Sequence, residues 1–205
     1  MRKSSWPEVQ SLIEEAPYPV TVLPTDAARG ADQLARLGLG TWSWLAAVVQ
    51  NSGGLLVDHG WLRVLGAGTA ELPGVADVAE PGGGRLTVAY DVLGGRFDWM
   101  ENDEGAPTIR YFGPEDLIWD DLGAGYGDWL ESVLRGGLTT FYSAVRWPGW
   151  EQEVAAVPLD KGIHTWPPPW STEGADLSAV SRRAISFAEL VSFHEEMARQ
   201  LDGQR

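Results

Sequence analysis

Three β-prone segments follow one another at close spacing in the middle of the chain. They span residues 86–93, 96–100 and 108–112, and residues 117–119 extend the series with a fourth. Connections this short join antiparallel neighbours, because parallel strands need a crossover of a dozen or more residues. The pattern therefore predicts an antiparallel β-sheet meander, and the helical segments on either side of it predict an α+β fold with the sheet flanked by helices.

The first connection in this series is Gly94-Gly95, within the sequence Y-D-V-L-G-G-R-F-D-W of residues 90–99. Two glycines between strand-like runs are typical of a two-residue hairpin turn with positive φ at both positions. A glycine loop that binds phosphate would instead lead into a helix N-terminus. Because β-prone residues follow the glycines, the sequence favours a hairpin here.

The sequence predicts mainly helices outside the meander. Helical patterns cover residues 7–16, 31–37, 43–50, 127–134 and 138–145. A capping box at Ser186 opens a last helix whose apolar side includes Phe187, Leu190 and His194. With no internal repeat and no linker, we expect a single domain over residues 1–205.

Three further segments have β character. Residues 20–23, between two prolines, predict a short edge strand. Residues 55–65 predict one strand with a bulge or bend at His59-Gly60. Residues 155–159 and 162–166 predict a hairpin around Asp160-Lys161, and the proline-rich and polar run after Trp166 predicts irregular structure.

The charge of the chain is strongly negative and unevenly spread. The net charge is −14, and residues 71–131 hold 14 acidic residues and three arginines. This balance argues against nucleic acid and against anionic membrane surfaces, which both need clustered Lys and Arg. The acidic stretch is either a solvated surface or a surface for a basic protein partner. The candidate partner-binding residues are Glu101, Asp103, Glu104, Asp116, Asp120 and Asp121.

Cysteine is absent from the chain, which excludes disulfides, thiolate catalysis and cysteine-based zinc sites. The first 16 residues have no apolar core of the kind that a signal peptide needs. The longest uncharged stretch, residues 37–57, is interrupted by Gln50-Asn51-Ser52 and is too polar to span a bilayer. We therefore expect a cytoplasmic protein that does not associate with membranes.

Motifs that carry chemistry are incomplete in this sequence. Gly66-Ala67-Gly68 misses the dinucleotide-binding pattern, and His194-Glu195 lacks the second histidine of a zinc-protease helix. Residues 101–105 lack the ligand spacing of a calcium loop. His59 beside Asp58 could be an oriented base, but neighbours on a strand point to opposite faces. We assign no catalytic residue, no metal site and no cofactor.

Tryptophan is unusually frequent, with 11 residues. Trp61, Trp119, Trp129 and Trp147 are each flanked by aliphatic residues at strand or helix spacing. A buried tryptophan contributes a large apolar surface. We expect these four side chains to be mostly buried.

Several longer motifs carry a resemblance to a known family. Residues 53–68 (GGLLVDHGWLRVLGAG), 91–97 (DVLGGRF), 111–123 (YFGPEDLIWDDLG), 141–151 and 167–170 resemble the bacterial domain-of-unknown-function family 2625. The chain departs from the family pattern at residues 96–99, where a second phenylalanine and a small residue would follow the glycines. That family has no assigned activity.

The order of these motifs also looks, more weakly, like the SUKH superfamily. Its members resemble yeast cell-wall regulators and bacterial immunity proteins that neutralise toxins. This resemblance implies a SUKH-like fold and a protein-binding role, although fold-level analogy is weak support for function.

Two functional hypotheses remain open from the sequence. The first is a non-catalytic protein-binding module, of immunity type, whose acidic face meets a basic protein. The alternative is a small hydrolase or carbohydrate-binding protein with carboxylates in a tryptophan-lined cleft. Two acidic residues converging in such a cleft would favour the alternative.

Overall fold

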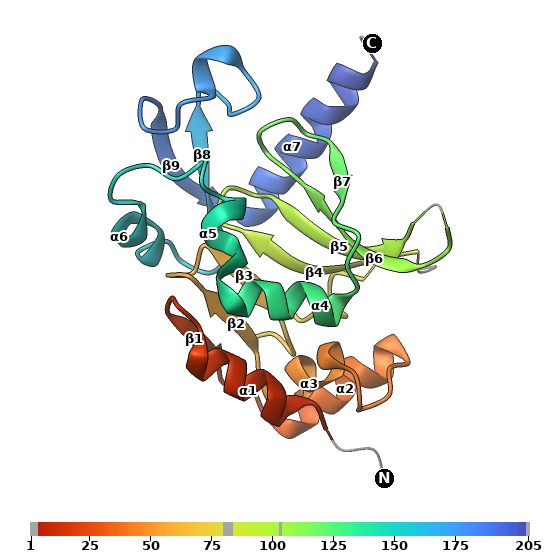
Figure 1. The fold of residues 1–205 in the computed structure, drawn as a ribbon. Coiled ribbons are helices and arrows are strands. Elements are labelled where there is room, and N and C mark those ends of the chain that lie inside the picture. Colours follow the sequence, from red (N-terminus) through yellow and green to blue (C-terminus); the bar gives the residue numbers. More distant parts are fainter. Residues whose placement is uncertain (1–3, 80–83, 103, 204–205) are drawn as a thin grey trace.

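A seven-stranded antiparallel sheet forms the centre of the computed structural model, which describes residues 4–79, 84–102 and 104–203. Its strands lie side by side in chain order from β1 to β7 (Figure 1). This arrangement confirms the predicted meander and the α+β class. The strands are β1 (Val20–Leu23), β2 (Gly54–Val57), β3 (Leu62–Leu65), β4 (Arg85–Asp91), β5 (Arg96–Glu101), β6 (Pro107–Phe112) and β7 (Trp119–Asp121).

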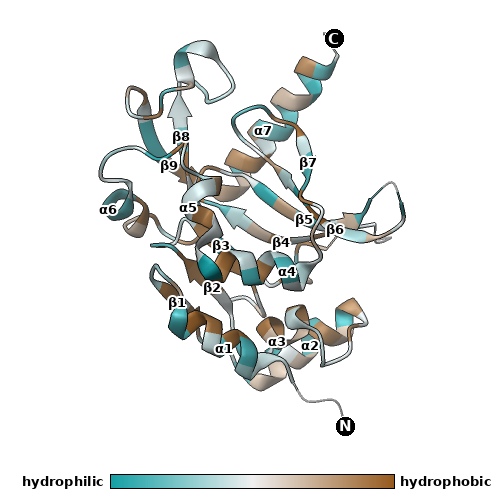
Figure 2. Ribbon diagram, viewed as in Figure 1, coloured by the Kyte–Doolittle hydropathy of each residue, from teal (hydrophilic) through white to brown (hydrophobic). Residues whose placement is uncertain are grey.

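Helices cover both faces of the sheet. In Figure 1, α4 and α5 lie in front of the strands and α7 lies behind them. Figure 2 shows hydrophobic and hydrophilic residues on both α1 and α4, as expected of helices with one buried and one exposed side. The bounds are α1 (Trp6–Glu15), α2 (Ala27–Leu37), α3 (Trp44–Asn51), α4 (Tyr126–Ser132), the π-helical η1 (Val133–Gly137), α5 (Leu138–Phe141), α6 (Trp150–Ala155), the 3-10 turn η2 (Thr172–Gly174) and α7 (Phe187–Asp202).

The Gly94-Gly95 segment is a hairpin turn, but its loop has three residues instead of two. Asp91 and Gly95 close the loop, because the amide of Asp91 donates to the carbonyl of Gly95 over 2.9 Å. Only Gly94 of the pair has positive φ, at 89°. A three-residue loop with glycine in the left-handed position is a common hairpin type. The expectation of positive φ at both glycines was therefore wrong for Gly95.

The segment 55–65 is also a hairpin and not one bent strand. Val57 of β2 pairs with Leu62 of β3, and the amide of Trp61 donates to the carbonyl of Asp58. His59 and Gly60 form the turn, with φ values of 61° and 84°. Positive φ at both central positions is the geometry of a type I′ turn, which matches the twist of paired strands.

A second, two-stranded sheet lies near the C-terminus and corrects the predicted hairpin around Asp160-Lys161. Strand β8 (Lys161–Trp166) pairs with β9 (Ser181–Ser186), which the sequence analysis did not predict. Residues 150–155 form α6, stabilised by acidic residues in its first turn. The partner of β8 was missed because 14 residues of proline-rich and polar chain separate the two strands.

Three of the four tryptophans expected in the core are buried, and the fourth is half-buried. Trp61, Trp129 and Trp147 are buried, with exposures of 0%, 5% and 2%. Trp119 is half-buried on the last strand, where the guanidinium carbon of Arg96 lies 4.9 Å from its ring centroid. The prediction is thus confirmed for three residues, and Trp119 is instead an edge residue that covers an arginine.

His194 of α7 is buried at the contact between α7 and the central sheet. Its side chain is 3% exposed, and its ring meets that of Trp170 edge-on at 5.5 Å. Burial lowers the pKa of His194 to about 4, and a hydrogen bond with the backbone of Gly94 only partly opposes this shift. The interpretation of His194 as a core-edge residue is confirmed.

The free energy of unfolding is expected to decrease as the pH decreases, because His194 is buried in its neutral form. Since the pKa in the folded chain is lower than the unfolded value, protonation favours unfolding, and stability is lost as the pH drops from 6.5 toward 4. A shift of this size corresponds to about 3 kcal/mol across that window. Urea unfolding at pH 7.5, 6 and 5 would measure the slope. His194→Gln should be less stable at pH 7.5 but have a flatter slope, and an unchanged slope would contradict the assignment. His59→Gln is the matched control at an exposed histidine.

Candidate ligand-binding site

The face of the sheet that α7 covers carries a row of charged and aromatic residues. Strand register places Arg63 beside Tyr90, Tyr90 beside Arg96, Arg96 beside Phe112 and Phe112 beside Trp119. The opposite face presents residues such as Phe97 and Ile109 to the hydrophobic core. Because successive strand residues alternate between faces, one sheet has an apolar and a polar side.

Helix α7 is held to this polar face by an ion pair that belongs to a small charged network. Arg96 Nη1 lies 2.6 Å from Oε1 of Glu195 on α7, and Arg96 Nε lies 3.3 Å from Oδ2 of Asp98. Arg85 also approaches Asp98, at 3.2 Å. Asp98 is fully buried, so these contacts compensate a charge that would otherwise be costly to bury. The network fixes the middle of α7 over β5.

An open cavity of about 500 Å³ lies beside the first turns of α7. Its apolar lining comes from the loop after β3, from β4 and from α7, and includes Leu72, Pro73, Val78, Tyr90, Phe187 and Val191. Arg63, Glu71, Asp160, Ser186 and Ser192 contribute polar groups. This volume and this lining are typical of pockets that bind small organic molecules.

Arg63 is the buried cation of this cavity. Its side chain is 1% exposed, and its Nη1 donates to the carbonyls of Leu159 at 3.0 Å and Lys161 at 2.5 Å. Nε is buried without a hydrogen-bond partner. Burial lowers the pKa of Arg63 to about 10, although Asp91 and Asp160 oppose the shift through longer-range attraction. The guanidinium therefore stays charged at neutral pH.

Arg63 was missed as a candidate in the sequence analysis. The available signal was an arginine between leucine and valine in the strand sequence L-R-V-L. A charged residue in such an apolar run is either on an exposed face or buried with a special role. Only the placement of α7, more than 120 residues later in the chain, decides between these two cases.

The five predicted partner-binding residues that the structure describes do not form one cluster. Glu101 and Glu104 lie at the β5–β6 hairpin end, where Glu101 pairs with Pro107. Asp116 lies in the loop after β6, at the other end of that strand, about 17 Å away along the strand at 3.4 Å per residue. Asp120 and Asp121 lie on β7, and Asp103 lies outside the described residues.

The five described residues of that set are exposed. Asp116 and Asp121 accept hydrogen bonds from the backbone amides of Ile118 and Gly123, so both stabilise local turns. Their role as a surface for a basic protein remains a prediction.

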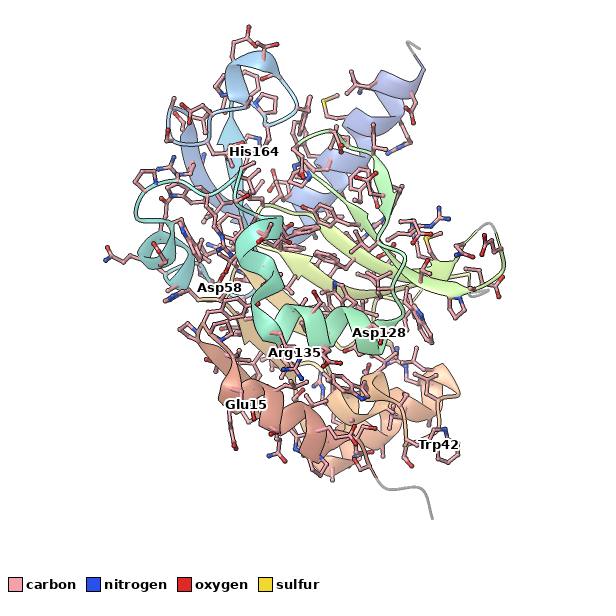
Figure 3. All side chains as sticks on the ribbon, in the orientation of Figure 1. Glu15, Trp42, Asp58, Asp128, Arg135 and His164 are labelled. Atoms are coloured by element: carbon pink, nitrogen blue, oxygen red, sulfur yellow. The ribbon has the colours of Figure 1, made fainter. Side chains whose placement is uncertain are left out.

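Asp58 and His59 do not form a catalytic pair. The carboxylate of Asp58, which is labelled in Figure 3, contacts the guanidinium of Arg146, a residue that precedes α6 in the chain. His59 is exposed, and its ring meets Trp150 edge-on at 5.7 Å. Arg146 lies over the same tryptophan, 4.2 Å from its ring centroid. This cluster links the β2–β3 turn to α6 and has the character of a structural ion pair.

Within residues 4–79, 84–102 and 104–203, no group of three His, Asp or Glu side chains is placed to hold a metal ion. None of the helices in those same ranges is long and apolar enough to cross a membrane.

Comparison with known proteins finds relatives along most of the chain. The family model described as "Protein of unknown function DUF2625" matches residues 1–190. The uncharacterised protein YbfG of Escherichia coli (strain K12) is 33% identical over 201 residues, which is 95% of this chain and 92% of YbfG. An uncharacterised protein of Haemophilus influenzae is 32% identical over 162 residues, or 74% of this chain and 71% of that protein. No solved structure matches significantly, so the likeness to the SUKH superfamily stays a prediction.

Proposed function

We propose that this chain, which belongs to the DUF2625 family of proteins of unknown function, is a binding protein that takes a mainly apolar small molecule into the cavity beside α7. The observation that carries the proposal is an open cavity of about 500 Å³ with apolar walls and one buried cation. Natural ligand pockets combine these properties, because apolar walls supply affinity and a few polar groups fix orientation.

The cavity favours this function over the alternative hydrolase or carbohydrate-binding site. Glu71 and Asp160 line it, but the lining includes no tryptophan on which a sugar ring could stack. The second part of the proposed binding role is an acidic surface that binds a basic protein. Its residues are Glu101, Glu104, Asp116, Asp120 and Asp121. It is weaker in support, because β6 separates these residues into two groups.

Two matched substitutions, each replacing an alanine with tryptophan, test whether the cavity is the binding site. Ala188 lines it at the start of α7, whereas Ala184 on β9 is exposed and lies outside it. The neutral fluorescent probe N-phenyl-1-naphthylamine is expected to bind wild-type protein saturably, with one molecule per chain. Ala188→Trp should weaken this binding roughly tenfold or more by filling the cavity, and Ala184→Trp should leave it unchanged. Absence of saturable binding, or equal binding by both variants, would exclude this cavity as the site.

A further inference from the structure

We propose that the cavity ligand carries a single negative charge, in the manner of a carboxylate, and that Arg63 is the residue that binds it. This inference rests on the proposed function and names the chemical class of the ligand. The geometry points to a molecule with an apolar body and one anionic group, such as a medium-chain carboxylic acid.

The hydrogen bonds of Arg63 use only part of its guanidinium group, and the buried Nε has no acceptor. Both hydrogen bonds of its side chain start from Nη1, and both end on backbone carbonyls, those of Leu159 and Lys161. No carboxylate of the described residues lies within ion-pair distance of Arg63. A guanidinium presents five N–H donors that suit carboxylate oxygens, and a buried one is costly without an anion in contact.

Other buried or half-buried arginines of the same protein have such anions. Arg96 contacts Asp98 and Glu195, Arg146 contacts Asp58, and Arg182 contacts Glu153. Arg63 is more buried than any of these. Its difference from them is therefore a missing partner of opposite charge, at a position that lines a cavity.

The start of α7 adds a second favourable feature for an anion. Ser186, Phe187 and Ala188 line the same cavity as Arg63, and the N-terminal end of a helix of this length carries a partial positive charge. The side chain of Ser186 makes no capping hydrogen bond, so its hydroxyl is free to donate to a ligand. The guanidinium carbon of Arg63 lies 5.9 Å from the ring centroid of Phe187, which places the cation near the helix start.

The remaining charges disfavour a second negative charge on the ligand. Glu71 and Asp160 line the cavity and repel a dianion such as a phosphate monoester. Leu72, Val78 and Val191 offer no donors to a second charged group. A single carboxylate on an apolar body meets both the cation and the apolar walls.

Calorimetry with three C10 probes tests the inference on the full chain. Decanoate, decan-1-ol and decyl phosphate share one apolar chain and differ in charge. Wild-type protein at pH 8 is expected to bind decanoate roughly tenfold to a hundredfold more tightly than decan-1-ol, the range for hydrogen bonds to charged groups. Arg63→Gln should remove this preference and leave decan-1-ol binding unchanged. Arg199→Gln, an exposed arginine of α7, is the control for loss of one positive charge.

The outcomes separate this inference from the proposed function. Equal binding of decanoate and decan-1-ol by wild-type protein would overturn the role of Arg63 and leave the cavity as a binding site. Binding of none of the probes would overturn both. Tighter binding of decyl phosphate would overturn the single charge. If circular dichroism shows that Arg63→Gln does not fold, Arg63→Lys replaces it. Arg63→Lys keeps the positive charge, so a reduced preference for decanoate supports recognition by the guanidinium. An unchanged preference for decanoate contradicts it.

Discussion

Replacing Trp61 with alanine is expected to lower the free energy of unfolding by about 3–5 kcal/mol, the usual cost of removing a buried tryptophan. The side chain is 0% exposed and packs against the rings of Tyr142, Trp147 and Trp150 at 5.1–5.6 Å between centroids. Arg146 also lies over its ring, 5.3 Å from the centroid. The substitution therefore opens a large cavity and removes the aromatic contact of a buried ion pair.

Urea unfolding monitored by circular dichroism measures this cost. Trp166→Ala is the matched control, because Trp166 is 63% exposed and its loss should change stability by no more than about 0.5 kcal/mol. Similar costs at the two positions would show that the aromatic cluster around Trp61 is not part of the core.

Local patterns in the sequence predicted the sheet better than they predicted what covers it. Short connections between β-prone runs are enough to fix antiparallel neighbours, so the order of β4, β5 and β6 followed from spacing alone. The helical pattern over residues 43–50 is likewise confirmed as α3, where the hydroxyl of Ser43 accepts a hydrogen bond from the amide of Ala46. These features depend on residues close together in the chain.

The candidate site depends on contacts between distant residues, and these were not predictable. Arg96 and Glu195 are 99 positions apart, and their ion pair joins α7 to the polar face of the sheet. Without α7 over that face, Arg63 and Asp98 would read as ordinary exposed strand residues. The sequence pattern at Ser186 predicted where α7 begins, but the expected capping box is not formed, because the side chain of Ser186 makes no capping hydrogen bond. The pattern also did not predict where α7 packs, with the amide of Phe187 donating to the carbonyl of Asp160.

The same contrast between local patterns and contacts of distant residues applies to the functional residues. The charge of the acidic residues is visible in the sequence, whereas the cavity combines residues of β3, β4, the loop after β3 and α7. A buried cation among apolar walls is invisible in the composition of a chain with a net charge of −14. The ligand inferred from the cavity is anionic, although the chain as a whole repels anions. Entry of such a ligand should therefore become faster with added salt, which screens the long-range repulsion.

Gly95→Ala is expected to be nearly as costly as the loss of Trp61, at about 3–5 kcal/mol, the range for depriving a buried charge of its partners. The carboxylate of Asp91 is fully buried and accepts from the amides of Leu93 and Gly95 and from the hydroxyls of Tyr111 and Tyr142. A Cβ at Gly95 would lie 2.1 Å from Oδ2 of Asp91 and 2.7 Å from the hydroxyl of Tyr111. Glycine is needed there for close approach and not for positive φ.

A control and a double-mutant cycle separate these two reasons for glycine. Gly105, at the β5–β6 turn, has φ of 78° and no atom within 4 Å of an added Cβ, so Gly105→Ala should cost only about 1 kcal/mol of backbone strain. Asp91→Ala removes the carboxylate that the new methyl group would meet. In that background Gly95→Ala should cost less than in wild-type protein, with a coupling energy of about 1–3 kcal/mol from urea unfolding. Costs that simply add would show that the Asp91 carboxylate is not the reason for glycine at position 95.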